Sequence, residues 1–268
     1  MKKTFFSSVL LAGLAPWSLA AVIVQDGFDD GGYGNGADPL DLDWSNIPED
    51  EVRNTAPQPA TGNYFAIDSR GNHTQRRGFL PVSSLLDLQV GQTLTLSFKL
   101  NYEDAPGDNA AGFRFGLMGA SGNRFGVGAV AGTGASTVLD LRYDQVNSDD
   151  DYFGGSNADN NRSYSGSVNA AMSSGLSAGT NYDVSLVMAR DATGMTISTS
   201  LNGGSSEVTI LESDAGFYTD FSGGVLVIRA GGVNADFNID DVQITVVPEP
   251  GGMLLLGLGG LLGLRRRR

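Results

Sequence analysis

The sequence predicts an all-β protein, an antiparallel β-sandwich of the jelly-roll kind, on three observations. Residues 93–100 (TLTLSFKL) alternate between polar and apolar side chains, as in an antiparallel strand with one face in the core. Similar short runs recur between clusters of Gly, Asn, Asp and Ser, and none carries a sustained helical period of apolar residues. Glycine accounts for 38 of 268 residues, which favours turns over helices. About ten to twelve short strands at this spacing are typical of a sandwich.

The expected strands follow these alternating runs along the chain. Residues 31–80 hold four prolines, so we expect long surface loops there with one strand, because proline does not fit a central strand. Residues 147–161 form a second long loop that is rich in aspartate. The expected strands are 63–68, 93–100, 113–118, 124–130, 137–143, 182–190, 195–201, 207–211, 224–230 and 237–246.

The first residues, 1–21, have the three parts of a secretory signal peptide. Lys2 and Lys3 form a positive start, residues 5–14 are mainly apolar, and residues 18–20 (SLA) offer a site for signal peptidase. Cleavage after Ala20 or Ala21 and export of the chain are therefore expected. The sandwich domain is predicted to cover residues 22–247.

The C-terminal residues, 248–268, form a second targeting segment with three parts. They are the sequence Pro-Glu-Pro, an apolar run over residues 251–264 and four arginines. As a helix the apolar run is about 21 Å long, whereas a bilayer core is about 30 Å thick, so it is a marginal transmembrane helix. The arginines favour the cytoplasmic side. We expect a temporary anchor in the inner membrane, cut near the prolines.

This segment resembles the PEP-CTERM sorting signal of Gram-negative bacteria. The resemblance implies recognition and processing by an exosortase, delivery to the cell surface or surroundings, and an exopolysaccharide or biofilm setting. A single-pass anchor that is never cut is the alternative. The sorting and processing residues are Pro248, Glu249, Pro250, Arg265, Arg266, Arg267 and Arg268.

Composition excludes several classes of function. The chain has no cysteine, which removes disulfides and thiolate chemistry, and its single histidine, His73, leaves little for imidazole-based sites. Without residues 1–21 and 248–268 it keeps 11 basic and 29 acidic residues, a net charge of −18. Such a body is repelled by phosphate backbones, so nucleic acid is not an expected partner.

Both ends of the body carry further motifs. Residues 26–31 (DGFDDG) open it, residues 237–244 (FNIDDVQI) close it, and residues 179–201 have the pattern of a hairpin. Together they resemble bacterial concanavalin A-like (LamG-type) jelly rolls and carbohydrate-binding modules, in which the first and last strands lie close together. The resemblance implies a structural calcium ion where these strands meet, with Asp26 and Asp241 as ligands. Strand alternation sends Asp240 to the opposite face, so it is the weaker candidate.

A second acidic cluster lies in the loop 147–161. It contains Asp149 and Asp151, beside Asn147, Asp159 and Asn160, and supplies the oxygen ligands that calcium prefers. Its spacing does not match an EF-hand loop. For both acidic clusters a solvated turn is the alternative.

Sugar recognition would require exposed aromatic side chains beside hydrogen-bonding groups. Tyr152 and Tyr164 flank the acidic loop, and together with Trp44 they are the candidate glycan-binding residues. Burial in the core is the alternative for each aromatic ring.

Catalytic patterns are weak. Residues 175–179 (GLSAG) match G-x-S-x-G, but the expected strand follows the serine and the histidine lies upstream, opposite to an α/β-hydrolase. The Glu-x-Asp-x-Glu strand of concanavalin-like glucanases is missing. We therefore expect a non-enzymatic surface or matrix protein that binds glycans or extracellular polysaccharide. A purely structural matrix protein and a glycan hydrolase with an aspartate pair are the alternatives.

Overall fold

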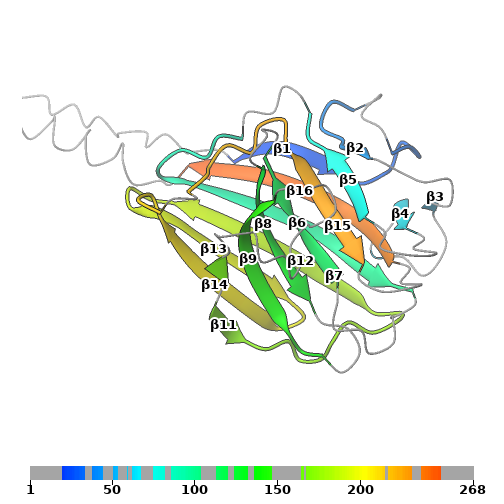
Figure 1. Ribbon diagram of the computed structural model, residues 1–268. Coiled ribbons are helices and arrows are strands. Elements are labelled where there is room, and N and C mark those ends of the chain that lie inside the picture. Colours follow the sequence, from blue (N-terminus) through cyan, green and yellow to red (C-terminus); the bar gives the residue numbers. More distant parts are fainter. Residues whose placement is uncertain are drawn as a thin grey trace, which may run out of the picture.

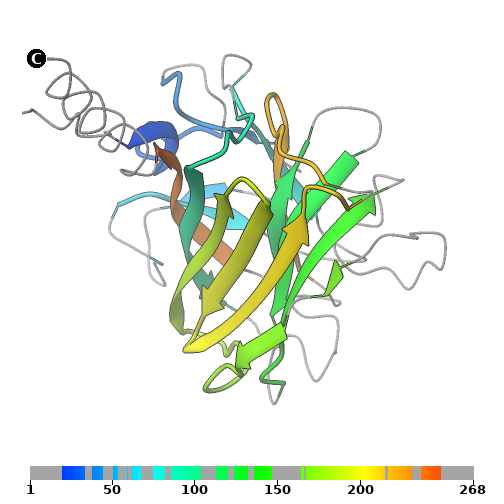
Figure 2. The ribbon, with the colours of Figure 1, turned by 90° about the vertical axis from the view of Figure 1, so that its left-hand side faces the viewer.

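The computed structural model describes residues 20–33, 38–44, 51–53, 59, 62–67, 75–81, 86–103, 113–119, 124–131, 136–146, 164–165, 167–214, 217–230 and 237–248. These residues form two antiparallel sheets packed face to face (Figures 1 and 2). The predicted antiparallel β-sandwich is therefore confirmed. The predicted signal helix and the C-terminal apolar helix lie outside the described residues. Within the described part, no helix has the length and apolar character needed to cross a membrane.

The larger sheet has nine strands and contains both ends of the described fold. The last strand, β16, pairs with β6 and β4 on its two sides, and the first strand, β1, also pairs with β16. The proximity of first and last strands is thus confirmed. In order, the sheet contains β11 (Ser167–Ala170), β14 (Gly204–Leu211), β13 (Gly194–Leu201), β12 (Asn181–Arg190), β6 (Gln92–Tyr102), β16 (Phe237–Pro248), β4 (Tyr64–Ile67) and β3 (Glu51–Arg53), with β1 (Ala21–Asp26) beside β16.

The smaller sheet has seven strands. Its order is β10 (Tyr164–Ser165), β9 (Leu139–Val146), β8 (Arg124–Ala131), β7 (Phe113–Met118), β15 (Val225–Ala230), β5 (Gln75–Phe79) and β2 (Asp43–Trp44). Every pairing that involves these strands is antiparallel.

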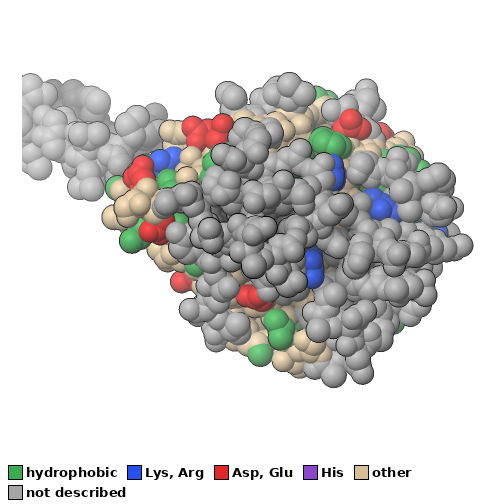
Figure 3. Space-filling view, viewed as in Figure 1, with side chains coloured by type: hydrophobic (Ala, Val, Ile, Leu, Met, Phe, Trp, Pro, Cys, Tyr) green, Lys and Arg blue, Asp and Glu red, His purple; other side chains and the backbone are tan. Residues whose placement is uncertain are grey.

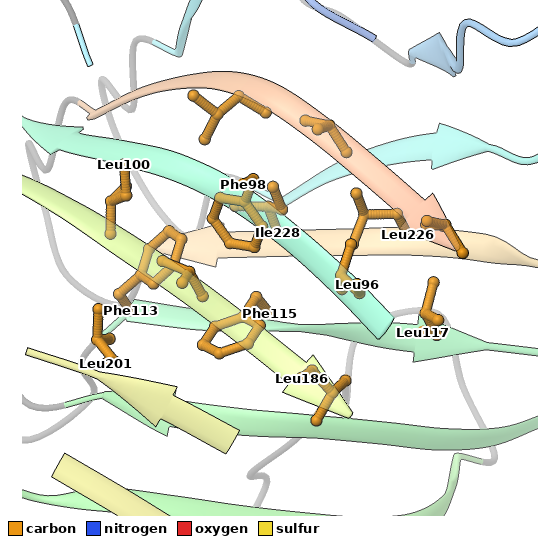
Figure 4. Packing of buried hydrophobic residues seen from close by; sticks show 14 of the residues in the cluster. Leu96, Phe98, Leu100, Phe113, Phe115, Leu117, Leu186, Leu201, Leu226 and Ile228 are labelled. Atoms are coloured by element: carbon orange, nitrogen blue, oxygen red, sulfur yellow. The ribbon is translucent and has the colours of Figure 1, made fainter. Parts of the chain in front are cut away.

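Alternating side chains of the two sheets fill the space between them. Leu96, Phe98 and Leu100 of β6 are each at most 2% exposed and lie among apolar residues of β7 and β15 (Figure 4). Phe98 meets Phe115 of β7 edge to face, with ring centroids 5.5 Å apart. This geometry is favourable for aromatic pairs. The intervening residues of β6 are half-buried on its outer face, so the alternation read from residues 93–100 is confirmed.

Every expected strand is present, but the expectation of a single strand within residues 31–80 was wrong. Besides β4, that region contributes β2, β3 and β5. The sequence of β5, QRRGF, lacks the polar and apolar alternation of a half-buried strand, and the charged Arg76 takes a buried position, at 3% exposed. A Cβ added at Gly78 would lie 2.8 Å from Leu42, so glycine allows β5 to approach the chain beside β2.

The strands at the two ends of the described fold reach Ala21 and Pro248. Strand β1 begins at Ala21, and β16 continues to Pro248, which pairs with Gln92 of β6. The first proline of the Pro-Glu-Pro sequence is thus part of the sheet.

Candidate functional site

The meeting of β1 and β16 is organised around a buried carboxylate, Asp26. It is 3% exposed, and Asp26 lies opposite Val242 in the register. Its Oδ2 accepts hydrogen bonds from the indole Nε1–H of Trp44 (2.8 Å) and the backbone N–H of Leu42 (3.3 Å), and its Oδ1 accepts one from the N–H of Phe28 (3.2 Å). Burial raises the pKa of Asp26, while these three hydrogen bonds act in the opposite direction.

Trp44 is a core residue, which corrects the expectation that it is an exposed sugar platform. It is 4% exposed, and its ring packs against Phe28 and Phe65 with centroids 6.1 and 5.4 Å away. A polar atom this deeply buried needs a partner, and Asp26 supplies it. The hydrogen bonds from Trp44 and Leu42 to Asp26 therefore connect β2 and the preceding loop to the end of β1.

An irregularity in β16 decides which of two adjacent aspartates is buried. The register between β16 and β6 shifts between Asp240 and Gln243, and Asp241 has a left-handed backbone with φ of 49°. Such a bulge re-aims the side chains around it. As a result Asp240 is 2% exposed and Asp241 is exposed.

Asp240 is only partly satisfied by hydrogen bonds. Its Oδ1 accepts a hydrogen bond from the backbone N–H of Asp241 (2.7 Å), but its buried Oδ2 has no partner among the described residues. Burial, together with the charges of Asp241, Asp29 and Asp26, raises the pKa of Asp240 to about 7. This carboxyl group is therefore poised to hold a proton near neutral pH.

Next to this junction, on the outer face of the larger sheet, lies a half-open cavity of about 890 Å³. It is bounded by β6, β12, β16, the end of β1 and residues from the following loop. Seven aspartates and one lysine are among the described residues that line it. They are Asp26, Asp29, Asp30, Asp38, Asp41, Asp183, Asp241 and Lys99, joined by the neutral polar residues Gln25, Ser97, Ser185 and Gln243.

The charges of this acidic cavity are unbalanced. Lys99 of β6 forms an ion pair with Asp183 of β12, which raises the pKa of the lysine. At Asp41, partial burial together with the charges of Asp26 and Asp38 raises the pKa to about 6. The cavity thus repels anions and offers many hydrogen-bond acceptors at its surface.

The structure brings some of the predicted residues together. Asp26 and Asp241, the two candidate calcium ligands, line the same cavity. Among the described residues no group of three or more His, Asp or Glu side chains has the arrangement of a metal site. Asp149, Asp151 and Tyr152 lie outside the described residues, and of Tyr164 only the backbone, in β10, is described.

The sequence analysis did not single out Asp41 and Asp183, and it ranked Asp240 below Asp241. Asp183 lies at an exposed, alternating position of β12, and only the sheet order shows that β12 neighbours β6. For Asp240 the sequence shows only that two aspartates are adjacent in one strand. Which of the two is buried depends on the bulge.

The segment 175–179 has the local structure of a turn before a strand. Ser177 Oγ donates to the carbonyl of Gly175 (3.3 Å), the Ser177 N–H donates to the Tyr182 hydroxyl (2.9 Å), and β12 follows directly. This differs from the strand-turn-helix of a hydrolase nucleophile.

Comparison with known proteins identifies the C-terminal segment. Residues 246–268 match the PEP-CTERM protein-sorting motif. The chain is thus an exported protein that carries an exosortase sorting motif, joined to an antiparallel β-sandwich. No curated protein sequence matches this chain.

Solved structures with a similar arrangement of strands include two lectins and a glucanase. Peanut lectin is 9% identical, with 86% of this chain and 97% of the lectin covered and a TM-score of 0.47. Lectin I from Ulex europaeus is 13% identical, with 86% and 98% covered and a TM-score of 0.47. Endo-1,3-beta-glucanase from Streptomyces sioyaensis is 15% identical, with 85% and 97% covered and a TM-score of 0.48. Similarity at this level assigns neither a ligand nor an activity.

Proposed function

We propose that this protein is an exported, non-enzymatic glycan-binding or adhesive protein of the cell surface or extracellular matrix. In this proposal the C-terminal segment anchors the chain in the inner membrane until an exosortase processes it. The match of residues 246–268 to the sorting motif supports the route of export. The binding function is supported by the acidic cavity.

The observation that carries the proposal is the lining of that cavity. Carboxylate, amide, hydroxyl and ammonium groups from the adjacent strands β12, β6 and β16 and from the end of β1 face one space of about 890 Å³, which lies within the usual size of ligand pockets. Sugar hydroxyl groups donate hydrogen bonds to such carboxylates. Phe98 is the one aromatic residue among the described lining, and its side chain lies in the core. Binding there would depend on hydrogen bonds rather than on aromatic stacking.

The charge of the cavity selects among glycans. Seven aspartates against Lys99 disfavour uronic acids, sulfates and phosphates and favour neutral sugars or amino sugars that carry a positive charge. We therefore propose a neutral or amino-sugar polysaccharide as the ligand. An acidic polysaccharide would need a divalent cation to bridge it.

We also propose a structural calcium ion near the meeting of β1 and β16. The residues favouring it are Asp26 and Asp241, which line one cavity, and Asp240, whose Oδ2 is buried without a described partner. Oxygen ligands of this kind suit calcium. Calcium would also neutralise part of the surrounding negative charge.

The test is binding of the full chain in detergent micelles to a panel of neutral, amino-bearing and acidic polysaccharides, with calcium and with chelator. The first variant is Asp183→Asn, which removes a carboxylate from the cavity, and its control is Glu207→Gln, an exposed carboxylate on β14 outside the cavity. We expect saturable binding of amino-bearing glycans that Asp183→Asn weakens several-fold and Glu207→Gln leaves unchanged. No binding to any member would contradict the proposal and favour a purely structural matrix protein.

A glycan hydrolase is the second candidate, because the cavity holds several carboxylates and a hydrolase requires two across the scissile bond. The release of new reducing ends from the bound polysaccharide would show hydrolysis. We expect none.

A further inference from the structure

The chain enters the described fold at β1 and leaves it after β16 at the same end of the sandwich. Ala21 of β1 lies directly opposite Val246 of β16, and Pro248 pairs with Gln92. The adjoining strand ends extend this surface, since Gln92 pairs with Arg190 and Gly194 pairs with Leu211. We call this surface the terminal pole. It comprises the starts of β1, β6 and β13, the ends of β12, β14 and β16, and the turn over residues 88–91, at the left in Figure 1.

The smaller sheet reaches the same pole. The Leu88 N–H donates to the carbonyl of Thr219 (2.9 Å), and the Leu80 N–H donates to the carbonyl of Gly224 (3.0 Å). Phe79, at the end of β5, pairs with Val225, where β15 starts. These contacts place Phe79 at the terminal pole.

Exposed apolar side chains concentrate there. Of the five large hydrophobic residues that are exposed in the described part of the chain, four lie at the terminal pole, and these are Val22, Phe79, Val90 and Leu211. The fifth, Val138, precedes β9 at the opposite end, where β8 ends. A small pocket at the pole, about 180 Å³ in volume, is lined by Ile23, Leu88 and Val246 among others. Figure 3 shows hydrophobic and acidic side chains side by side at its left-hand end.

The connection between the pole and the apolar C-terminal run is very short. Only Glu249 and Pro250 separate the last residue of β16 from residue 251. Three backbone steps reach at most about 10 Å. The polar head groups of a bilayer form a layer of about 5–7 Å on each side of the core. The apolar run is itself shorter than the bilayer core, and this mismatch draws its flanking residues inward.

We propose that, while residues 251–264 are in the membrane, the terminal pole lies against the lipid head groups, with Val22, Phe79, Val90 and Leu211 in contact with the bilayer surface. This inference rests on the temporary anchoring in the proposed function. The short connection fixes the placement, and the apolar side chains make it favourable. Carboxylates at the pole, among them Asp87, Asp191 and Glu212, weaken the contact with anionic lipids.

The docking leaves the acidic cavity free for a ligand. Along β6, Ser97 and Lys99 lie five and seven residues beyond Gln92. At about 3.3 Å per residue they are about 17–23 Å from the terminal pole, outside the head-group layer. A tethered molecule can therefore bind a ligand before it is released.

The experiment compares two single-cysteine variants of the full chain. The natural chain has no cysteine, so a fluorophore attached at Val90→Cys or Val138→Cys is unique, and the two valines are matched at 53% and 52% exposed. The labelled chains are reconstituted in zwitterionic phospholipid vesicles, with nitroxide quenchers on some head groups. We expect the label at residue 90 to lose most of its fluorescence and the label at residue 138 to keep it.

The outcomes separate this inference from the anchoring on which it rests. A chain that does not float with the vesicles overturns the anchoring and the docking together. A chain that floats while both labels stay equally bright overturns the docking alone. A Gly/Ser linker of about 20 residues after Pro248, with a span of about 25 Å, should restore most of the fluorescence at residue 90. Persistent quenching in that variant would contradict the role of the short connection.

Discussion

Two buried carboxylates close to the meeting of the first and last strands differ in how they are satisfied. Asp26 accepts three hydrogen bonds, from Trp44, Leu42 and Phe28. Asp240 accepts one, from the N–H of Asp241, and its Oδ2 has no described partner. Two buried carboxylates can therefore have different roles. A carboxylate surrounded by donors stabilises the fold, whereas one that lacks donors favours a proton or a cation.

The largest expected effect comes from removing the satisfied carboxylate. Asp26→Ala leaves the Trp44 indole and two backbone N–H groups buried without an acceptor, so the free energy of unfolding should fall by about 3–5 kcal/mol. Urea denaturation of the full chain in detergent measures this. The control is Asp43→Ala, an exposed residue of β2, where we expect less than about 0.5 kcal/mol. Equal effects would show that the hydrogen bonds of Asp26 do not hold this region.

The second prediction concerns the pH dependence that Asp240 creates. Its pKa is raised to about 7 in the folded chain, from an ordinary value of 3.8. Between these values the folded chain keeps the proton that the unfolded chain has lost. Stability should therefore fall as the pH rises from about 4 to about 7, by up to about 4 kcal/mol in total. Asp41, with its pKa raised to about 6, acts in the same direction.

Denaturation at a series of pH values in the presence of chelator tests this dependence. Asp240→Asn should flatten the slope, while the control Glu207→Gln, an exposed carboxylate on β14, should leave it unchanged. Calcium should restore stability to the natural chain near pH 7 and have less effect on Asp240→Asn. A slope that survives Asp240→Asn would assign the titration to other groups.

A smaller loss of stability is expected from substitution of Trp44, which donates a hydrogen bond to Asp26. Trp44→Phe keeps an aromatic ring beside Phe28 and Phe65 but removes the indole N–H, so Asp26 Oδ2 retains only the bond from Leu42. The free energy of unfolding should fall by about 1–3 kcal/mol. The pKa of Asp26 should also rise, because a hydrogen bond that favours its charged form is lost. A thermal unfolding temperature equal to that of the natural chain would contradict this role of the indole.

The smallest effect on stability belongs to the exposed pair that Lys99 forms with Asp183. Lys99→Ala should change the free energy of unfolding by less than about 1 kcal/mol, because solvent screens such pairs. The affinity for an amino-bearing glycan should increase by more than the stability changes. Without its lysine the cavity is more negative, which favours a positively charged ligand. Calorimetry in low and high salt would measure this gain, which should shrink with salt. A loss of binding instead would indicate that Lys99 itself contacts the ligand.

The sequence by itself determined the strands that alternate and the sorting segment, whereas the meeting of the first and last strands was implied only by the resemblance to known jelly rolls. Strict alternation, as in residues 93–100, needs no knowledge of neighbours, because a period of two fits only a half-buried strand. The sorting segment is equally local, since its three parts follow one another along the chain.

Only the tertiary structure decided what is buried where the pattern is irregular. The residues QRRGF pair as strand β5 between β15 and β2, where Gly78 leaves room for Leu42, a contact between segments that are distant in sequence. The bulge at Asp241 determines that the Asp240 side chain is buried. The Trp44 ring is buried where its indole N–H donates a hydrogen bond to Asp26. For β5 and Trp44 the deciding partner lies on another strand or loop, and for Asp240 it is the irregular pairing of β16 with β6, so burial depends on these contacts rather than on the residue's own type.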